Sequence, residues 1–299
     1  KGNLSVLNSR FGRFSITAQP KIALLRENGR WMVPRAGVPT THILKAPLGK
    51  VGERQVDLSD SSENEWICLR VLREFGLSAA KAEVIEFDGM SALAVERFDR
   101  VREGEAIVRS PQEDLCQASG LPPGRKYEAD GGPGIPEICR QFLAHSADPG
   151  DIRNFLRAQI IFWMLRATDG HAKNFSLFLL GESRHRLTPF YDVLSAWPVI
   201  GEGSHRLPER KVKLSMCLRG KNRHYQMYDV QRRHFISTAA LSGIGEKEAG
   251  EIIDELIDLT PRVADAVGAA LVTPAEVRTG EAILRGLRES ASRLAVKHL

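Results

Sequence analysis

The sequence predicts an α+β fold of two lobes, a small β-rich N-lobe over residues 1–100 and a mainly α-helical C-lobe over residues 101–299. Strand-like stretches separated by turns recur in the first hundred positions, whereas helix-like apolar spacing marks residues 246–296. At 299 residues, of which 42% are hydrophobic, the chain can bury one substantial core or two smaller ones.

Composition excludes a membrane-spanning helix, because the chain has no run of about 18 apolar residues. The first twenty residues also lack the apolar core of a secretory signal. The chain has no initiator Met, so we expect a fragment of a longer protein. Four widely spaced cysteines without a C-x-x-C pair favour free thiols in a reducing cytoplasm over disulfides or a zinc site, and they are Cys68, Cys116, Cys139 and Cys217.

Positive charge is concentrated in one segment. The whole chain carries a net charge of +5, and residues 201–240 alone hold nine Lys or Arg against three Asp or Glu. Such a segment suits an acidic partner, either nucleic acid or an acidic protein surface. A solvated surface is the alternative.

Residues 14–26 predict a loop followed by a strand that starts at Ile22. The loop holds Ser15 and Thr17. Backbone N–H groups in such a loop can bind phosphate, and a glycine usually allows the close approach. This loop has no glycine, so a plain β-turn is an equal alternative.

Alternation over residues 41–45 predicts a strand that ends at Lys45. A lysine on a strand that faces a nucleotide pairs with its α- and β-phosphates. An exposed edge lysine is the alternative.

Ser62-Glu63-Asn64-Glu65 has the pattern of a capping box that opens a helix ending at Gly76. Trp66, Leu69, Leu72 and Phe75 give this helix one buried stripe. Glu65 either belongs to the capping box or orients Lys45 through an ion pair.

Residues 91–98 predict a strand that runs into the connection between the lobes. At such a connection backbone groups would hydrogen-bond adenine, and the Phe98 ring either stacks on adenine or packs in the core. The Gly- and Pro-rich residues 119–136 predict a long loop without a regular element, a plausible segment for protein substrate or activation. Asp151 then is expected to cap an apolar helix that leads to Asp169.

Residues 167–192 carry the clearest chemical pattern. Asp169, four intervening residues and Asn174 have the spacing of a phosphotransferase catalytic loop, in which the Asp accepts the proton of an attacking hydroxyl and the Asn holds a metal ion. Asp192, beyond a short strand, would hold Mg²⁺ together with Asn174, because Mg²⁺ prefers oxygen ligands. The alternative is a polar turn, since Asp-Gly is a common turn signal.

Two further residues of this stretch are candidates for catalysis. His171 would touch a phosphate or the substrate hydroxyl, with a structural histidine as the alternative. Lys173 lies between the predicted catalytic residues in sequence, where a cation would neutralise charge on the transferring phosphoryl group. Phe175, Leu177 and Leu179 alternate on the following strand and are expected to anchor Asn174 at its start.

The C-terminal part predicts helices over 246–259, 261–271 and 274–296, with Pro261 and Pro274 at or near two of the helix starts.

Six motifs in one order resemble the HipA family, the toxin kinases of bacterial type II toxin–antitoxin operons. The resemblance covers nearly the whole chain. The motifs are His-Ile-Leu-Lys (42–45), Asn-Glu-Trp (64–66), Val-Glu-Arg-Phe-Asp-Arg (95–100), Pro-Gln-Glu-Asp (111–114), Thr-Asp-Gly-His-Ala-Lys-Asn (168–174) and Pro-Phe-Tyr-Asp (189–192).

The resemblance implies a two-lobed protein-kinase-like fold and a serine/threonine kinase that uses ATP and Mg²⁺. It implies a protein substrate, an aminoacyl-tRNA synthetase such as glutamyl-tRNA synthetase, whose phosphorylation arrests growth and leads to persistence. It also implies a further N-terminal subdomain in full-length relatives, a small HipB-like helix-turn-helix antitoxin as partner, and operator DNA bound by the complex. A catalytically weak co-repressor on DNA, and nucleotidyl transfer on the same fold, are the alternatives.

The resemblance also carries roles onto single residues. Lys45 matches the ATP lysine, Glu96 and Phe98 match adenine-contacting positions, and Gln112 matches a further nucleotide-site residue. Ser15 aligns with the serine that the family autophosphorylates, although this loop is one residue short and Thr17 is nearer to the gap. Expected DNA contacts in the basic segment are Arg219, Lys221 and Arg223.

Overall fold

The computed structural model describes residues 19–296 apart from 36, 88 and 105. Its N-terminal part is an antiparallel sheet of five strands in the order β2-β1-β3-β7-β6. The predicted strands at 22–26, 41–45 and 91–98 are confirmed to within a residue or two. The strands are β1 (Lys21–Glu27), β2 (Arg30–Met32), β3 (His42–Lys45), β6 (Ala82–Phe87) and β7 (Met90–Glu96).

Short sheets continue beyond this sheet, so strands are present on both sides of residue 100. Two are hairpins, β4 (Gly49–Val51) with β5 (Val56–Leu58) and β8 (Arg100–Glu103) with β9 (Ala106–Arg109). A three-stranded sheet joins β10 (Gln112–Asp114), β11 (Ser176–Gly181) and β12 (Arg184–Leu187), and a last pair joins β13 (Lys213–Arg219) and β14 (Arg223–Gln226).

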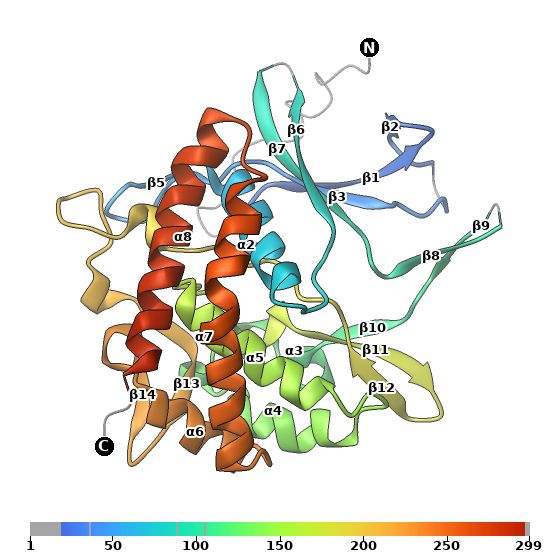
Figure 1. Cartoon of the computed structure of the whole chain (residues 1–299). Helices are drawn as coiled ribbons and strands as arrows, with labels where there is room; N and C mark the ends of the chain where they lie inside the picture. The colour runs from blue at the N-terminus through green and yellow to red at the C-terminus, as the bar shows by residue number, and fades with distance from the viewer. Residues whose placement is uncertain (1–18, 36, 88, 105, 297–299) are drawn as a thin grey trace.

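The helices of the described residues lie mostly after residue 114, which confirms the α+β class. They are α2 (Ser61–Glu74), α3 (Leu115–Ala118), α4 (Ile135–Gln141), α5 (Asp151–Met164), α6 (Arg232–Leu241), α7 (Glu246–Gly268) and α8 (Pro274–Ala295). Figure 1 shows α7 and α8 running side by side along one flank, with α2 between them and the N-terminal sheet. None of the helices in the described ranges is long and apolar enough to cross a membrane.

Strand register directs Lys45 toward α2. Lys45 pairs with Leu93 of β7, and paired residues of an antiparallel sheet project to the same face. Leu93 belongs to a cluster with Ala80 and Val95 that packs against Trp66 of α2. The opposite face carries a separate small cluster around Leu44.

Helix α2 starts differently from the prediction. Asp60 is the N-cap residue, and the helix has no side-chain cap. The carboxylate of Asp60 instead accepts hydrogen bonds from Arg278 and Thr279 of α8. The capping box is therefore wrong, because the carboxylate of Glu65 is bound by Lys45 instead of by the helix N-terminus.

The predicted end of α2 at Gly76 is confirmed. Gly76 has φ of +82°, and its N–H donates to the Arg73 carbonyl at 2.8 Å while Leu77 N–H donates to Leu72 at 3.0 Å. This is a Schellman motif, in which glycine is favoured because it adopts positive φ without strain.

Asp151 does not cap α5. Gly150 is the N-cap, and the carboxylate of Asp151 accepts hydrogen bonds from Ser146 Oγ at 2.5 Å and from the Leu187 N–H at 2.6 Å. Asp151 thus joins α5 to β12. The predicted anchor Leu179 is 40% exposed, whereas Phe175 and Leu177 are buried as expected.

The predicted helix boundary at Pro261 is also wrong, because α7 is continuous from Glu246 to Gly268. Pro261 is exposed, so water can reach the carbonyl that proline leaves without a helical partner. Buried residues on both sides of Pro261, including Leu256 and Val263, hold the helix against its neighbours.

The main core joins α2 to the C-terminal helices. Leu69 and Leu72 of α2 lie in one cluster with residues of α5, α7 and α8. Helix α2 falls within the range predicted for the N-lobe, yet it packs on both the sheet and the helices. Movement of α2 would therefore be transmitted to both parts of the chain.

Residues 119–136 contain two short 3₁₀ turns, 123–125 and 128–130, before α4 begins at Ile135. The segment is fixed to the C-terminal part. Glu128 is buried, and its carboxylate accepts hydrogen bonds from the Cys217 N–H at 2.6 Å and from Arg219 at 2.7 Å.

The contact of Gly286 with Trp197 yields a test of the packing. A Cβ atom at Gly286 of α8 would lie 2.2 Å from the Trp197 ring. We predict that Gly286→Ala lowers the free energy of unfolding by about 1–3 kcal/mol, as overpacking does, despite the better helix propensity of alanine. Urea denaturation measures it. Gly250→Ala in α7 is the matched control, since its Cβ meets only Arg232 at 3.5 Å, and it should be neutral or stabilising. Equal stability of the two variants would contradict this packing.

Candidate functional site

The loop from Asp169 to Asn174 is closed by its own hydrogen bonds. The His171 N–H donates to the Asp169 carbonyl at 2.9 Å, and Asn174 Nδ2 donates to the same carbonyl at 2.6 Å. Gly170 permits this turn, because a Cβ there would lie 2.7 Å from the Phe162 ring. Asn174 Nδ2 also lies 3.4 Å from the Asp192 carbonyl, so the loop and the second predicted acidic residue are adjacent.

Lys45 connects three elements at the centre of the site. Its Nζ donates to both carboxylate oxygens of Glu65 at 2.7 and 2.9 Å and to Asp192 Oδ1 at 2.9 Å. Lys45 and Glu65 are buried, whereas the side chain of Asp192 is 30% exposed. The predicted ion pair between Glu65 and Lys45 is confirmed.

These contacts set the charge of each group. Burial favours the neutral form of Lys45, but Glu65 and Asp192 more than offset it, so the pKa of Lys45 is raised. Burial alone would raise the pKa of Asp192, but the charge and hydrogen bond of Lys45 hold the pKa of that carboxyl below its usual value. For Glu65 burial prevails over Lys45, and the pKa is raised.

Asn64 ties α2 to the segment that follows Asp192. Its Oδ1 accepts a hydrogen bond from the Ser195 N–H and its Nδ2 donates to the Ser195 carbonyl, both at 2.8 Å. Ser195 Oγ in turn donates to the Leu165 carbonyl at 2.6 Å. Asn64 thus holds Ser195 directly, whereas the neighbouring Glu65 is linked to Asp192 only through Lys45. Asp192 has φ of +59°, a conformation that this clamp helps to maintain.

The Asp169 carboxylate faces a different environment. Its side chain is 52% exposed, and Oδ1 accepts a hydrogen bond from the Tyr127 hydroxyl at 2.9 Å. His171 Nε2 lies 3.6 Å from the same oxygen. Burial lowers the pKa of His171, although the charge of Asp169 acts in the opposite direction. The lowered pKa favours the neutral imidazole.

Lys173 is directed away from Asp169. Its Nζ donates to Asp114 Oδ2 at 2.6 Å, and Asp114 is the N-cap of α3. The Lys173 carbonyl accepts from the Tyr191 hydroxyl at 2.9 Å. The ammonium of Lys173 is therefore bound to Asp114, and its predicted part in transfer stays a prediction.

The predicted adenine positions lie where β7 leaves the sheet. Phe98 contacts the rings of Phe178 and Tyr191, with centroids 5.9 and 5.6 Å away. The side chain of Glu96 is exposed, and Gln112 is half-buried on β10. Their roles toward adenine stay predictions.

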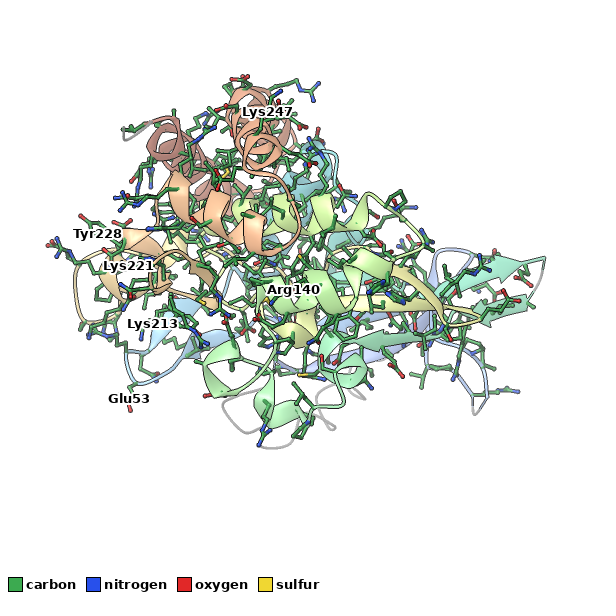
Figure 2. All side chains as sticks on the ribbon, turned by 90° about the horizontal axis from the view of Figure 1, so that it is seen from below. Glu53, Arg140, Lys213, Lys221, Tyr228 and Lys247 are labelled. Atoms are coloured by element: carbon green, nitrogen blue, oxygen red, sulfur yellow. The ribbon has the colours of Figure 1, made fainter. Side chains whose placement is uncertain are left out.

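The remaining predicted residues lie away from the group formed by Lys45, Asp192 and the 169–174 loop, or outside the described part of the chain. Ser15 and Thr17 lie outside the described residues. Arg219 is a correction: its side chain is 16% exposed and its guanidinium binds Glu128 at 2.7 Å, so it is not available for DNA phosphate. Lys221, in the turn between β13 and β14, and Arg223, the first residue of β14, are exposed, and Figure 2 shows Lys221 pointing outward at the edge of the molecule.

Sequence reasoning missed the buried residue Arg166. It has φ of +53°, and its guanidinium lies 4.8 Å from the ring centroids of both Trp163 and Trp197. Burial lowers its pKa to about 10. Arg166 precedes Asp169 by three residues, so these contacts fix the start of the predicted catalytic loop. A lone arginine after an apolar helix gives no signal of this role.

Asn64, Asp114 and Tyr127 were also missed as site residues. Asn64 belongs to the Asn-Glu-Trp motif, and Asp114 ends the Pro-Gln-Glu-Asp motif, so a signal for these two was present. Tyr127 lies in the 119–136 segment, where no motif includes it and the hydroxyl of its side chain is the only signal.

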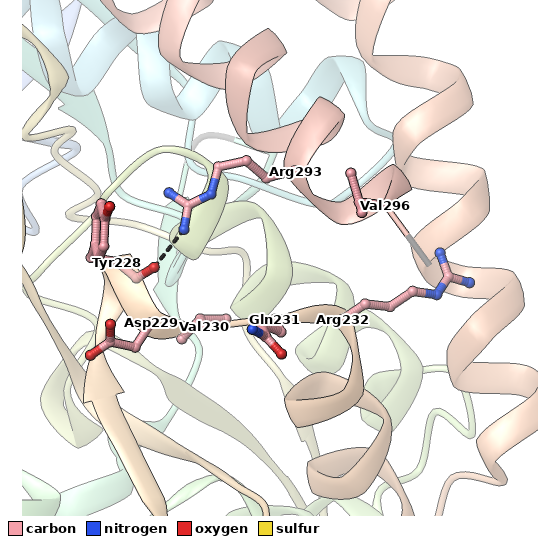
Figure 3. A pocket seen from close by; sticks show the side chains of 7 residues that line it. All are labelled: Tyr228, Asp229, Val230, Gln231, Arg232, Arg293 and Val296. Carbon is pink, nitrogen blue, oxygen red and sulfur yellow. Dashed lines mark hydrogen bonds between the residues drawn. The ribbon is translucent and has the colours of Figure 1, made fainter. Parts of the chain in front are cut away.

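A cavity of about 440 Å³ beside the end of α8 holds none of the predicted residues (Figure 3). There Arg293 donates to the Tyr228 carbonyl at 2.6 Å. The lining residues are Tyr228, Asp229, Val230, Gln231, Arg232, Arg293 and Val296.

Comparison with known proteins shows the family to which the chain is similar. The model of the HipA-like C-terminal domain family matches residues 16–264. The Sinorhizobium fredii protein named "Putative kinase Y4mE" is 29% identical over 277 residues, 92% of this chain and 61% of that protein. The Shewanella oneidensis serine/threonine-protein kinase toxin HipA is 28% identical over 190 residues, 59% of this chain and 42% of that protein. The chain thus spans about half the length of these relatives.

Solved structures confirm the predicted two-lobed kinase-like fold. Shewanella oneidensis HipA, solved with HipB and its operator DNA, has a TM-score of 0.75 at 20% identity over 94% of this chain and 65% of that chain. The Helicobacter pylori proinflammatory kinase CtkA has a TM-score of 0.55 at 13% identity over 94% and 90% of the two chains.

The Asn64 clamp can be tested through stability. We predict that Asn64→Ala lowers the free energy of unfolding by roughly 2–4 kcal/mol, because it leaves the buried N–H and carbonyl of Ser195 without partners. Denaturant titration measures it. Asn222→Ala, at an exposed turn, is the matched control and should change stability by less than about 0.5 kcal/mol. A loss for Asn64→Ala no larger than for the control would show that the clamp does not hold α2.

Proposed function

The chain belongs to the HipA-like C-terminal domain family, and from this premise we propose that it is an ATP-dependent serine/threonine protein kinase, the toxin of a toxin–antitoxin pair. The observation that carries the proposal is the meeting of Lys45, Glu65 and Asp192 within 2.7–2.9 Å, next to the Asp169–Asn174 loop. A buried lysine paired with a helix glutamate, beside a metal-binding aspartate, is the arrangement on which phosphoryl transfer depends in protein kinases.

Each residue then has a defined task. Lys45 binds the α- and β-phosphates of ATP, and Glu65 fixes its ammonium. Residues 96–98 contact adenine, and Gln112 is a further residue of the nucleotide site. Asp169 orients a Ser or Thr hydroxyl for attack on the γ-phosphate and accepts its proton. Neutral His171, beside Asp169, is placed to touch the phosphate or that hydroxyl.

The donor set fits Mg²⁺. Asn174 uses its amide nitrogen for the Asp169 and Asp192 carbonyls, which leaves its carboxamide oxygen for a metal ion, and the lowered pKa of Asp192 keeps its carboxylate charged. One or two such oxygen ligands are what Mg²⁺ usually takes from a protein. When bound, the ion supplies positive charge to the phosphate oxygens.

The family resemblance supports an aminoacyl-tRNA synthetase, such as glutamyl-tRNA synthetase, as the protein substrate, so that phosphorylation arrests growth and favours persistence in the cytoplasm. The similar Shewanella structure contains HipB and operator DNA. By that likeness, a HipB-like antitoxin binds this chain and the complex sits on its operator. A catalytically weak co-repressor on DNA is the second candidate, supported by the exposed cations Lys221 and Arg223.

Growth on induction separates the two candidates. We predict that induction of the wild-type chain without antitoxin arrests bacterial growth, whereas Asp169→Gln does not, because it replaces the proton-accepting carboxylate with a neutral amide. Asp258→Gln, on the exposed face of α7, should arrest growth like the wild type. Equal arrest by wild type and Asp169→Gln would assign the effect to binding. The mass of the adduct on the target separates phosphoryl from nucleotidyl transfer.

Salt dependence tests the DNA contact. In the complex with a HipB-like antitoxin, we predict that Lys221→Ala with Arg223→Ala weakens operator binding and reduces the slope of log affinity against log salt by about two, one for each lost phosphate contact. Lys247→Ala is the control, because Lys247 is an exposed lysine of α7 (Figure 2). Fluorescence anisotropy at several salt concentrations measures it, and an unchanged slope would leave these cations as solvated surface.

A further inference from the structure

Tyr127 makes a contact with the predicted catalytic carboxylate that no motif of the sequence announced. Its hydroxyl donates a hydrogen bond to Asp169 Oδ1 at 2.9 Å. Tyr127 lies 42 residues before Asp169, in the segment between α3 and α4. The distance is that expected between a catalytic base and its hydrogen-bond partner, so the contact bears directly on the reacting group.

The backbone around Tyr127 is fixed on both sides. The Lys126 carbonyl accepts a hydrogen bond from Ala172 N–H at 3.1 Å, within the catalytic loop itself. The Tyr127 carbonyl accepts from Gly132 N–H at 2.9 Å. A Cβ at Gly132 would lie 2.5 Å from the Arg125 carbonyl oxygen, so this close turn requires glycine. Next in sequence, buried Glu128 is bound by Cys217 and Arg219.

The ring is also held in place. It meets His171 edge-on with centroids 5.0 Å apart, and the Lys126 ammonium lies 5.0 Å from its centre. Burial and the neighbouring charge of Asp169 raise the pKa of Tyr127, so the phenol keeps its proton and remains a donor. Tyr127 is therefore a rigid donor and has little freedom to leave Asp169.

We propose that Tyr127 is a positioning residue for the phosphoryl transfer proposed above: by donating to Oδ1 it holds the Asp169 carboxylate so that Oδ2 receives the acceptor hydroxyl. The inference rests on the proposed function. In the transfer, the acceptor oxygen forms a bond to the γ-phosphorus, the bond from that phosphorus to the β–γ bridging oxygen breaks, and ADP leaves. The proton of the acceptor hydroxyl passes to Oδ2 of Asp169.

The exposure of the Asp169 side chain shows that Tyr127 does not block access to its carboxylate. With Tyr127 in place, the Asp169 side chain is still 52% exposed, and Oδ2 has no hydrogen-bond partner among the described residues. An acceptor hydroxyl can therefore reach the second oxygen without displacing the tyrosine. A carboxylate fixed through one oxygen has fewer orientations to lose when the acceptor binds, which is the usual source of a gain in rate from positioning.

The test compares Tyr127→Phe with the wild type in transfer of labelled γ-phosphate from Mg-ATP to proteins of a heat-treated bacterial lysate. The variant removes only the hydroxyl and keeps the ring on His171. We expect kcat to fall about ten- to hundredfold, the effect of losing a hydrogen bond to a charged group, while KM for ATP stays unchanged because the Lys45 group is untouched. Tyr228→Phe, on a half-exposed ring remote from Asp169 in sequence, should retain the wild-type rate.

Testing Tyr127→Phe in an Asp169→Ala variant shows whether Tyr127 acts through Asp169. In Asp169→Ala, adding Tyr127→Phe should cause no further loss, because residues that act as one unit are not additive. A further loss there, or an unchanged kcat for Tyr127→Phe alone, would overturn the inference. A raised kcat would overturn it too, since Tyr127 would then block the acceptor. Transfer by the wild type decides the proposed function separately: without it both proposals fail, and with it only the ratio of the variants decides the role of Tyr127.

Discussion

The buried ammonium of Lys45 is the interaction on which the rest of the site depends. It donates to Glu65 from α2 and to Asp192 from the segment after β12, so one charge joins the sheet, a helix and the predicted metal-binding segment. Removing charges from water costs several kcal/mol per ion unless each is well paired. Loss of Lys45 would leave the Glu65 and Asp192 carboxylates without their shared cation, so the three elements depend on this one ammonium for their arrangement.

Neutral hydrogen bonds and packing give this ion cluster its geometry. Asn64 fixes Ser195 beside the cluster, and Ser195 fixes Leu165 at the end of α5. Arg166, the residue after Leu165, extends this series of contacts, because its guanidinium lies near the rings of both Trp163 and Trp197. Since Trp197 packs on α8 at Gly286, the position of Asp169 is linked through a few contacts to the longest helices of the chain.

Sequence reasoning succeeded where the signal was local. Alternation placed the strand that ends at Lys45, and the spacing of Asp169 and Asn174 marked the loop. It failed where a distant partner decides. Glu65 fits a capping box by local pattern, but its carboxylate accepts hydrogen bonds from Lys45. Pro261 indicates a helix start, but packing on both sides keeps α7 continuous. Arg219 looked like a surface cation because Glu128, its buried partner, lies 91 residues earlier.

The two aspartates of the site differ in the kind of partner that the fold gives them. Asp192 meets a cation, which stabilises its charged form and suits a group that must remain an anion beside phosphate and metal. Asp169 meets a neutral phenol and is half exposed. A hydrogen bond from a neutral donor orients a carboxylate without the strong preference for the charged form that an ammonium imposes. Two carboxylates in different environments can then serve different roles, as acid–base chemistry near neutral pH requires.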